Sequence, residues 1–273
     1  MSTALGTLGI WQFTAKATPE LAGEVERLGY GTVWIGGSPD GSLEQAEALL
    51  DATERITVAT GIVNMWKDDA APVAASYHRL EAKHPGRFLL GVGIGHREHT
   101  KEYQSPYDKI VGYLDQLDDA GVPADRRVLA ALGSRVLELS AARAAGAHPY
   151  LTTPEHTAFA RKVIGPDALL APEQKVVLET NAELARAIGR KIVKGYLGLV
   201  NYRQNLLRFG FSEDDLADGG SDRLVDALVL HGDVETVARG LRTHLEAGAD
   251  HISIQALGGD LVPAYQALAE ALR

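Results

Sequence analysis

The sequence predicts an α/β protein with parallel strands: a (β/α)8 TIM barrel with a helical insertion before the last strand. Three observations support this fold. Helical patterns repeatedly end in Gly just before a short apolar run, eight such strand-like runs can be found, and the 273 residues come close to the ~250 typical of such a barrel. A doubly wound open sheet is the alternative, because the same alternation of elements also builds that fold.

Four glycines each separate a predicted helix from a predicted strand. Gly can adopt the left-handed conformation without a Cβ clash, and it therefore ends helices. These glycines are Gly29, Gly121, Gly146 and Gly248. The strand-like runs that follow them cover residues 32–35, 128–131, 147–151 and 251–254, and the four other predicted strands cover 5–11, 56–63, 87–92 and 175–178.

Helix starts agree with this alternation. A hydroxyl residue before Pro is typical of the first turn of a helix, and this pair occurs at Thr18-Pro19, Ser105-Pro106 and Thr153-Pro154. Residues about 194–230 do not fit the alternation of helices and strands. This segment combines aromatic residues with polar turns and is too long for a simple connection between a strand and a helix. We expect a helical insertion there, a lid or an interface element, within a single domain covering 1–273.

Composition excludes several classes of protein. The net charge of −9 argues against binding to nucleic acid or to an anionic membrane surface, and the absence of Cys excludes disulfides, thiolate metal sites and a Cys nucleophile. The first 12 residues lack the pattern of a signal peptide, and no apolar run is long enough to span a bilayer. We therefore expect a soluble, cytoplasmic protein that acts on a small molecule.

A glycine-rich strand end is the first candidate site. Residues 91–95 read Gly-Val-Gly-Ile-Gly after an apolar run, which lets a ligand approach the backbone, although such glycines also relieve crowding inside a barrel. His96 follows directly, at the end of a strand where barrel enzymes keep catalytic groups, and it is the candidate catalytic residue. Asn64 ends another strand and could read the edge of a heterocycle, although a plain turn also explains it.

An anion site is predicted at a helix start. Gly133, Ser134 and Arg135 follow a strand and open a helix, where free backbone N–H groups and a cation suit a phosphate. His148 and Thr152 lie at the next strand-to-helix turn. There is no Walker loop, nucleophile elbow or zinc-protease motif, and no metal site is expected. The pattern fits an enzyme whose chemistry belongs to a bound organic cofactor.

Several segments resemble one known family along nearly the whole chain. They are residues 28–34, 59–64, 86–96, 128–133, 146–150 and 233–255. In order and spacing they are similar to the luciferase-like flavin and deazaflavin oxidoreductases, in particular an actinobacterial subgroup that depends on coenzyme F420. The resemblance implies a barrel that binds F420, or alternatively FMN, at the carboxyl ends of its strands, and a homodimer.

The resemblance also implies residue roles. His96 would assist proton transfer, and a non-prolyl cis peptide would lie near Val63 and Asn64. The implied cofactor-binding residues are Gly61, Val63, Asn64, Gly93, Ile94, Gly95, Leu132, Gly133, Ser134, Arg135, Gly146, Ala147, His148 and Thr152.

One segment departs from the family pattern. Residues 36–40 read Gly-Gly-Ser-Pro-Asp where F420 dehydrogenases often carry an acidic residue with His, so Asp40 is at most a weak substitute and sugar-phosphate oxidation is not expected. The sequence therefore predicts hydride transfer between C5 of a deazaflavin and a small organic substrate. The alternatives are an FMN-dependent monooxygenase and a non-catalytic flavin-binding barrel.

Overall fold

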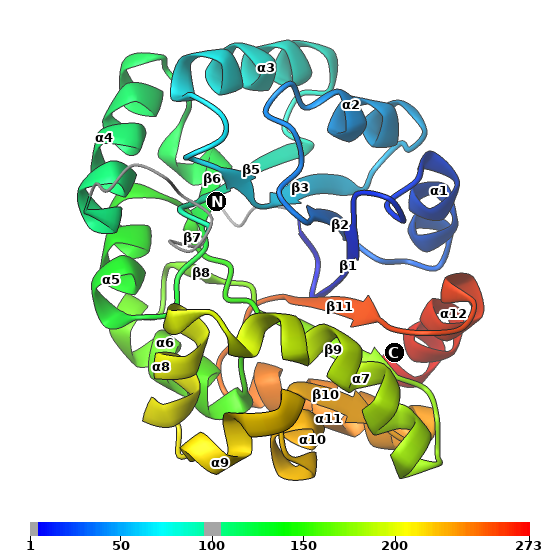
Figure 1. Cartoon of the computed structure of the whole chain (residues 1–273). Helices are drawn as coiled ribbons and strands as arrows, with labels where there is room; N and C mark the ends of the chain where they lie inside the picture. The colour runs from blue at the N-terminus through cyan, green and yellow to red at the C-terminus, as the bar shows by residue number, and fades with distance from the viewer. Residues whose placement is uncertain (1–4, 96–104) are drawn as a thin grey trace.

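Parallel strands form the inner layer of the protein in the computed structural model, which describes residues 5–95 and 105–273 (Figure 1). The strands are β1 (Leu8–Phe13), β2 (Thr32–Gly36), β3 (Thr57–Gly61), β4 (Val63–Asn64), β5 (Phe88–Gly93), β6 (Arg127–Leu129), β7 (Gly146–Ala147), β8 (Leu169–Leu170), β9 (Glu173–Val177), β10 (Val229–His231) and β11 (Ile252–Ala256). All eight predicted strands are present; β8 and β10 are too short for their patterns to be recognised.

Helices cover the outside of the strands. Eight of them pack around the sheet: α1 (Pro19–Arg27), α2 (Glu44–Asp51), α3 (Ala70–Lys83), α4 (Pro106–Asp119), α5 (Ser134–Arg143), α6 (Pro154–Ile164), α11 (Val234–Glu246) and α12 (Leu261–Leu272). Among the described residues, no helix is long and apolar enough to cross a membrane.

The strands close into a barrel. They pair in parallel in the order β11, β1, β2, β3, β5, β6, β7, β8, and β4 extends β3 along β5. Only Ala171 and Pro172 separate β8 from β9, and backbone bonds run on both sides of this break: the N–H of Ala171 donates to Ala147 in β7 (3.0 Å), and that of Ser253 in β11 donates to Pro172 (3.0 Å). Residues 169–177 thus act as one strand that joins both ends of the sheet. The predicted barrel is confirmed, and the open sheet is excluded.

The predicted helix boundaries largely hold. Thr18 accepts a hydrogen bond from the N–H of Leu21, and Ser105 caps α4 in the same way. Gly29 and Gly248 have φ of +91° and +102°, the conformation expected of a helix stop. Gly146 differs, because it lies within β7, where a Cβ would come within 1.9 Å of the carbonyl oxygen of Leu169. It is Gly because two strands approach closely there.

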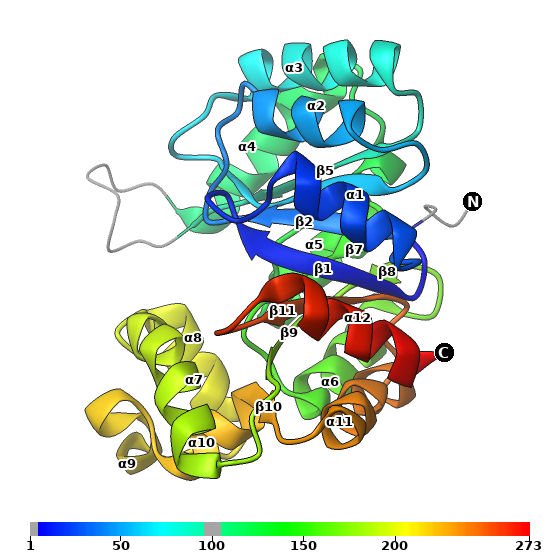
Figure 2. The same cartoon turned by 90° about the vertical axis from the view of Figure 1, so that its right-hand side faces the viewer.

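The insertion before the last strand is helical. It consists of α7 (Ala182–Leu197), α8 (Val200–Arg208), α9 (Glu213–Leu216) and α10 (Asp222–Leu228). The next strand, β10, pairs with β9 along the edge opposite β11. The insertion therefore begins earlier than the predicted residue 194, since α7 runs unbroken from residue 182. Figure 2 shows these helices at the end of the barrel toward which the strands point, with the C-terminus at the other end.

Candidate active site

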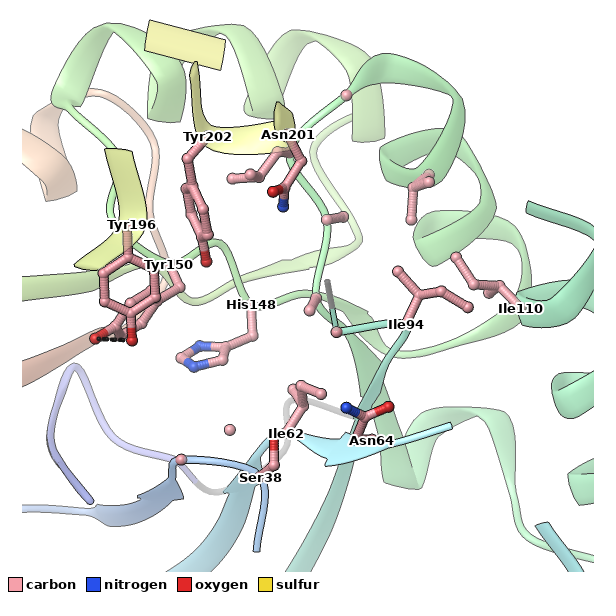
Figure 3. A pocket seen from close by; sticks show the side chains of 18 of the residues that line it. Ser38, Ile62, Asn64, Ile94, Ile110, His148, Tyr150, Tyr196, Asn201 and Tyr202 are labelled. Atoms are coloured by element: carbon pink, nitrogen blue, oxygen red, sulfur yellow. Dashed lines mark hydrogen bonds between the residues drawn. The ribbon is translucent and has the colours of Figure 1, made fainter. Parts of the chain in front are cut away.

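A cavity of about 470 Å³ opens at the carboxyl ends of the barrel strands, under the insertion helices (Figure 3). Seven residues predicted from the sequence line it: Gly61, Asn64, Ile94, Gly95, Leu132, Gly133 and His148. They come from strand ends far apart in the sequence, which the closed barrel brings together. The other predicted residues do not line the cavity, except that His96 lies outside the described part of the chain.

A backbone bulge at the end of β3 forms one wall. The peptide bond between Gly61 and Ile62 is cis, so the expected non-prolyl cis bond near Val63 and Asn64 is present just before Val63. Gly61, Ile62 and Asn64 line the cavity, whereas Val63 faces the opposite way into the hydrophobic core between strands and helices. The Oδ1 atom of Asn64 accepts the N–H of Trp66 (2.9 Å), so Asn64 both forms a turn and faces the cavity.

The glycines of β5 serve two purposes. A Cβ on Gly91 would lie 1.8 Å from the carbonyl oxygen of Thr60, whose hydroxyl bonds to both the N–H and the C=O of Gly91. Gly93 likewise relieves crowding, since its Cβ would come within 3.0 Å of Ile62. Gly95 has φ of +63° and lines the cavity beside Asn64. Close packing with neighbouring residues thus explains Gly91 and Gly93, whereas Gly95 forms part of the cavity wall.

The predicted anion site lies at the start of α5. Leu132 and Gly133 line the cavity, whereas Ser134 and Arg135 are exposed and begin the helix just beyond it. The guanidinium of Arg135 stacks 3.6 Å over the ring of Tyr107 on α4. This contact holds a cation next to a helix N-terminus, where the first N–H groups lack partners within the helix.

His148 lies on the floor of the cavity, after β7. Its Nδ1 atom lies 2.6 Å from the carbonyl oxygen of Ala171, and its ring stacks on Trp34 with a centroid distance of 4.0 Å. Burial lowers the pKa of His148 to about 3, so the ring is neutral at physiological pH. Since a carbonyl only accepts, Nδ1 carries the proton and Nε2 is a bare acceptor.

Three further predicted residues lie in β7 or shortly after it and do not line the cavity. Gly146 and Ala147 form β7 itself, and the side chain of Thr152 is buried behind the wall. His96 lies outside the described residues; in the sequence it directly follows Gly95, which lines the cavity. Asp40 is exposed and pairs with Lys67 (3.1 Å), so it makes no part of the cavity wall.

Trp11 is a floor residue that the sequence reasoning missed. It points inward from β1, and its indole crosses β2 where Gly36 leaves room, since a Cβ on Gly36 would lie 1.8 Å from its Cζ2 atom. Its Nε1 atom is buried beside Gly61 and makes no hydrogen bond to any described residue. A signal is present in the sequence: Gly9 and Trp11 lie on the same face of a predicted strand, and Gly36 directly follows the next predicted strand.

Tyrosines from the insertion complete the cavity on the side opposite Asn64 (Figure 3). Tyr196 and Tyr202 from α7 and α8 meet Tyr150, and the Tyr196 hydroxyl donates to that of Tyr150 (3.2 Å). Beneath them, Lys175 lies 3.7 Å over the Tyr150 ring and pairs with Glu173 (2.8 Å); both charges are completely buried. Burial raises the pKa of Glu173 and lowers that of Lys175.

No charged side chain lines the cavity among residues 5–95 and 105–273. Nor do those residues contain a group of three or more His, Cys, Asp or Glu side chains placed to hold a metal ion. The fold and site thus define a (β/α)8 barrel with an uncharged small-molecule pocket at the carboxyl ends of its strands, the usual place of barrel active sites.

Comparison with known proteins agrees with this class. Residues 2–115 match the sequence profile of the family described as luciferase-like monooxygenase, so this part of the chain is similar to that family. No curated protein sequence matches the chain.

Solved structures of similar fold include proteins with either kind of cofactor. An F420-dependent secondary alcohol dehydrogenase in complex with an F420–acetone adduct has a TM-score of 0.77 at 14% identity, with 98% of this chain and 99% of that chain covered. The coenzyme F420-dependent tetrahydromethanopterin reductase from Methanopyrus kandleri has a TM-score of 0.73 at 14% identity, with 98% and 99% covered. The oxygenating constituent of 3,6-diketocamphane monooxygenase from Pseudomonas putida, in complex with FMN, has a TM-score of 0.70 at 16% identity, with 97% and 96% covered. At these identities the likeness establishes the fold.

Proposed function

We propose that this protein is an F420-dependent oxidoreductase that transfers a hydride between the deazaflavin and a small organic substrate. The observation that carries the proposal is the cavity of about 470 Å³, which is uncharged among the described residues and bounded by glycine backbone at the ends of β3 and β5. Flat rings pack against backbone that lacks side chains. The family match of residues 2–115 and the fold of the F420-dependent neighbours support the same proposal.

The residues present fit such a cofactor. The floor offers two buried polar atoms that have no partner within the described part of the chain, Trp11 Nε1 and His148 Nε2, and they suit the polar edge of a ring system. The start of α5, with Gly133, Ser134 and Arg135, suits a phosphate by its N–H groups and its cation. When bound, a deazaflavin supplies the hydride-carrying carbon, C5.

The chain itself would orient the ring, exclude water and supply a proton. An apolar wall and the tyrosines under the insertion line the cavity, and they would exclude water from the part of the ring that they contact. His148 is neutral and lacks a proton on Nε2, so it cannot act as the acid. We therefore assign proton transfer to His96, which follows Gly95 in the sequence.

The test is a titration of purified protein with F420 and with FMN, followed by the fluorescence of each cofactor. We expect F420 to bind more tightly than FMN. Tight FMN binding without F420 binding would overturn the choice of F420 in favour of a flavin-dependent enzyme, and binding of neither would overturn the proposal and indicate a non-catalytic barrel.

His96 is tested separately, by a stopped-flow screen of hydride acceptors against reduced F420. His96→Ala should slow hydride transfer by about 10²- to 10⁴-fold, the range that proton transfer by a positioned side chain contributes, and leave F420 affinity almost unchanged. His78→Ala, which removes an exposed histidine on α3, is the matched control and should change neither quantity. An unchanged rate in His96→Ala would remove His96 from the reaction.

A further inference from the structure

Two tryptophan–histidine pairs lie inside the barrel, one satisfied and one open. In the satisfied pair, Trp34 Nε1 donates to His251 Nε2 (3.0 Å), and the other ring nitrogen of His251 bonds to the carbonyl oxygen of Gly6 (2.7 Å). In the open pair, Trp11 Nε1 and His148 Nε2 are both buried and make no hydrogen bond to any described residue. The open pair is the one that lines the cavity.

The two unpaired nitrogens face the same small space beside Gly61. A Cβ built on Gly61 would lie 2.6 Å from Trp11 Nε1 and 3.1 Å from His148 Nε2. Both side chains are held in place: Trp11 contacts the ring of Tyr150 (4.9 Å between centroids), and His148 stacks on Trp34 and is anchored at Ala171. A buried polar atom left without a partner costs about as much as a lost hydrogen bond. Among the described residues with such an atom, Trp11 and His148 are the two that line the cavity, where a ligand can supply the missing partners.

The chemistry of the pair restricts what it can bind. The indole N–H only donates, and His148 Nε2 only accepts because Nδ1 carries the ring proton. A ketone, a carboxylate or a phosphate cannot donate to Nε2, and no cationic side chain of the described residues lines the cavity to receive an anion. The ligand must place an acceptor and a donor side by side.

We propose that Trp11 and His148 recognise the imide edge of the cofactor ring, its adjacent C=O and N3–H, and thereby hold that edge at the bottom of the cavity. This inference rests on the proposed function, since F420 and FMN both carry this edge. It also fixes the direction of the ring: the imide lies on the floor beside Gly61, and the phosphate-bearing chain leaves toward the start of α5.

The experiment compares FMN with N3-methyl-FMN, which lacks the N3–H, and includes F420 titrations of every variant. The wild-type protein should bind the methylated flavin at least tenfold more weakly than FMN, because His148 Nε2 then loses its donor. In His148→Ala this discrimination should vanish, since both the acceptor and the steric limit are gone. In Trp11→Phe both flavins, and F420, should bind about tenfold more weakly while the discrimination persists.

Trp66→Phe is the matched control, because it makes the same change at a tryptophan that does not line the cavity and keeps the backbone N–H that Asn64 accepts. It should leave the discrimination and the cofactor affinities within about twofold of the wild type. Thermal unfolding of each variant reports whether it is folded, and the comparison of the two flavins on the wild-type protein needs no variant.

The outcomes separate the two proposals. If the wild-type protein binds neither F420 nor FMN, the proposed function fails and this inference fails with it. If a cofactor binds but methylation at N3 has no effect on the wild type, or if Trp11→Phe and His148→Ala bind both cofactors as the wild type does, only the imide assignment is overturned. That second result would indicate that the pair holds water or a substrate hydroxyl instead.

Discussion

Replacing Lys175 by Met should test the buried ion pair of Lys175 and Glu173 beneath Tyr150. Lys175 and Glu173 are both completely buried, and their side chains meet at 2.8 Å. In Lys175→Met, the Oε2 atom of Glu173 keeps only the N–H of Leu151 (3.2 Å), and its Oε1 atom has no partner among the described residues. The variant therefore leaves a buried carboxylate without a cation, while Met fills most of the vacated volume.

The expected loss is large. Removing one partner of a buried ion pair costs about 3–5 kcal/mol, because the desolvation of the remaining charge is no longer offset. The cation–π contact of Lys175 with Tyr150, at 3.7 Å, is lost as well and favours the upper part of this range. We expect the free energy of unfolding at pH 7 to fall by about 4 kcal/mol in denaturant titrations.

The loss should depend on pH. Burial raises the pKa of Glu173, and Lys175 opposes that effect, so the pKa rises further in the variant. A carboxyl group with a raised folded-state pKa stabilises the fold below its unfolded pKa, and this stability is lost as the pH rises through the folded value. The deficit of Lys175→Met relative to the wild type should therefore be small near pH 5 and grow toward pH 8.

The assay is chemical denaturation of four proteins from pH 5 to pH 8. Adding Glu173→Gln to Lys175→Met removes the unpaired charge and should recover at least half of the loss. The control, Lys83→Met, breaks an exposed pair with Asp51 (2.8 Å) and should cost less than about 1 kcal/mol at any pH. A deficit below 1 kcal/mol for Lys175→Met, or one that does not change with pH, would refute the reasoning.

Three further predictions concern the histidines, the bulge and the anion site. Burial lowers the pKa to about 3 for His148 and to about 4 for His156, His244 and His251. Below pH 6.5 the unfolded chain therefore binds protons that the folded chain does not. The free energy of unfolding should fall from pH 6.5 toward pH 4, by up to about 1.4 kcal/mol per pH unit for each of these histidines. Acid titration by circular dichroism measures this, and a flat profile down to pH 4 would contradict it. Gly61→Ala places a methyl group 2.6 Å from Trp11 Nε1 and should weaken cofactor binding at least tenfold with little loss of secondary structure; unchanged affinity would mean that ligands do not reach the floor. Arg135→Ala should weaken FMN about threefold to tenfold and leave riboflavin, which lacks the phosphate, unaffected, whereas an equal effect on both would remove Arg135 from phosphate binding.

The strands and their ends can be predicted from the sequence, because apolar periodicity and the glycines that end helices are local features. Gly29 and Gly248 mark strands correctly, whereas Gly146 was misassigned as a helix stop, since close contact with another strand selects the same residue. The insertion was placed too late because α7 has the same amphipathic pattern as a barrel helix.

The floor of the cavity could not be predicted in the same way. The role of Trp11 depends on Gly36 and Gly61 in two other strands, so it follows from the register of the closed barrel rather than from any one segment. Val63 and Asn64 are neighbours on one strand, so only one of them can face the cavity. The partner atoms that make His148 an acceptor lie 23 residues away, at Ala171.

The cavity is assembled from two separately variable parts of the chain. The barrel supplies the floor and the glycine walls, on strands where substitution disturbs the whole ring, whereas α7 and α8 supply Tyr196, Asn201 and Tyr202 from outside the ring. Exchanging these helices for those of a relative would alter the upper wall of the cavity and leave its floor in the barrel intact. Under the proposed function, the substrate range can therefore change, in evolution or by engineering, while the residues that bind the cofactor stay the same.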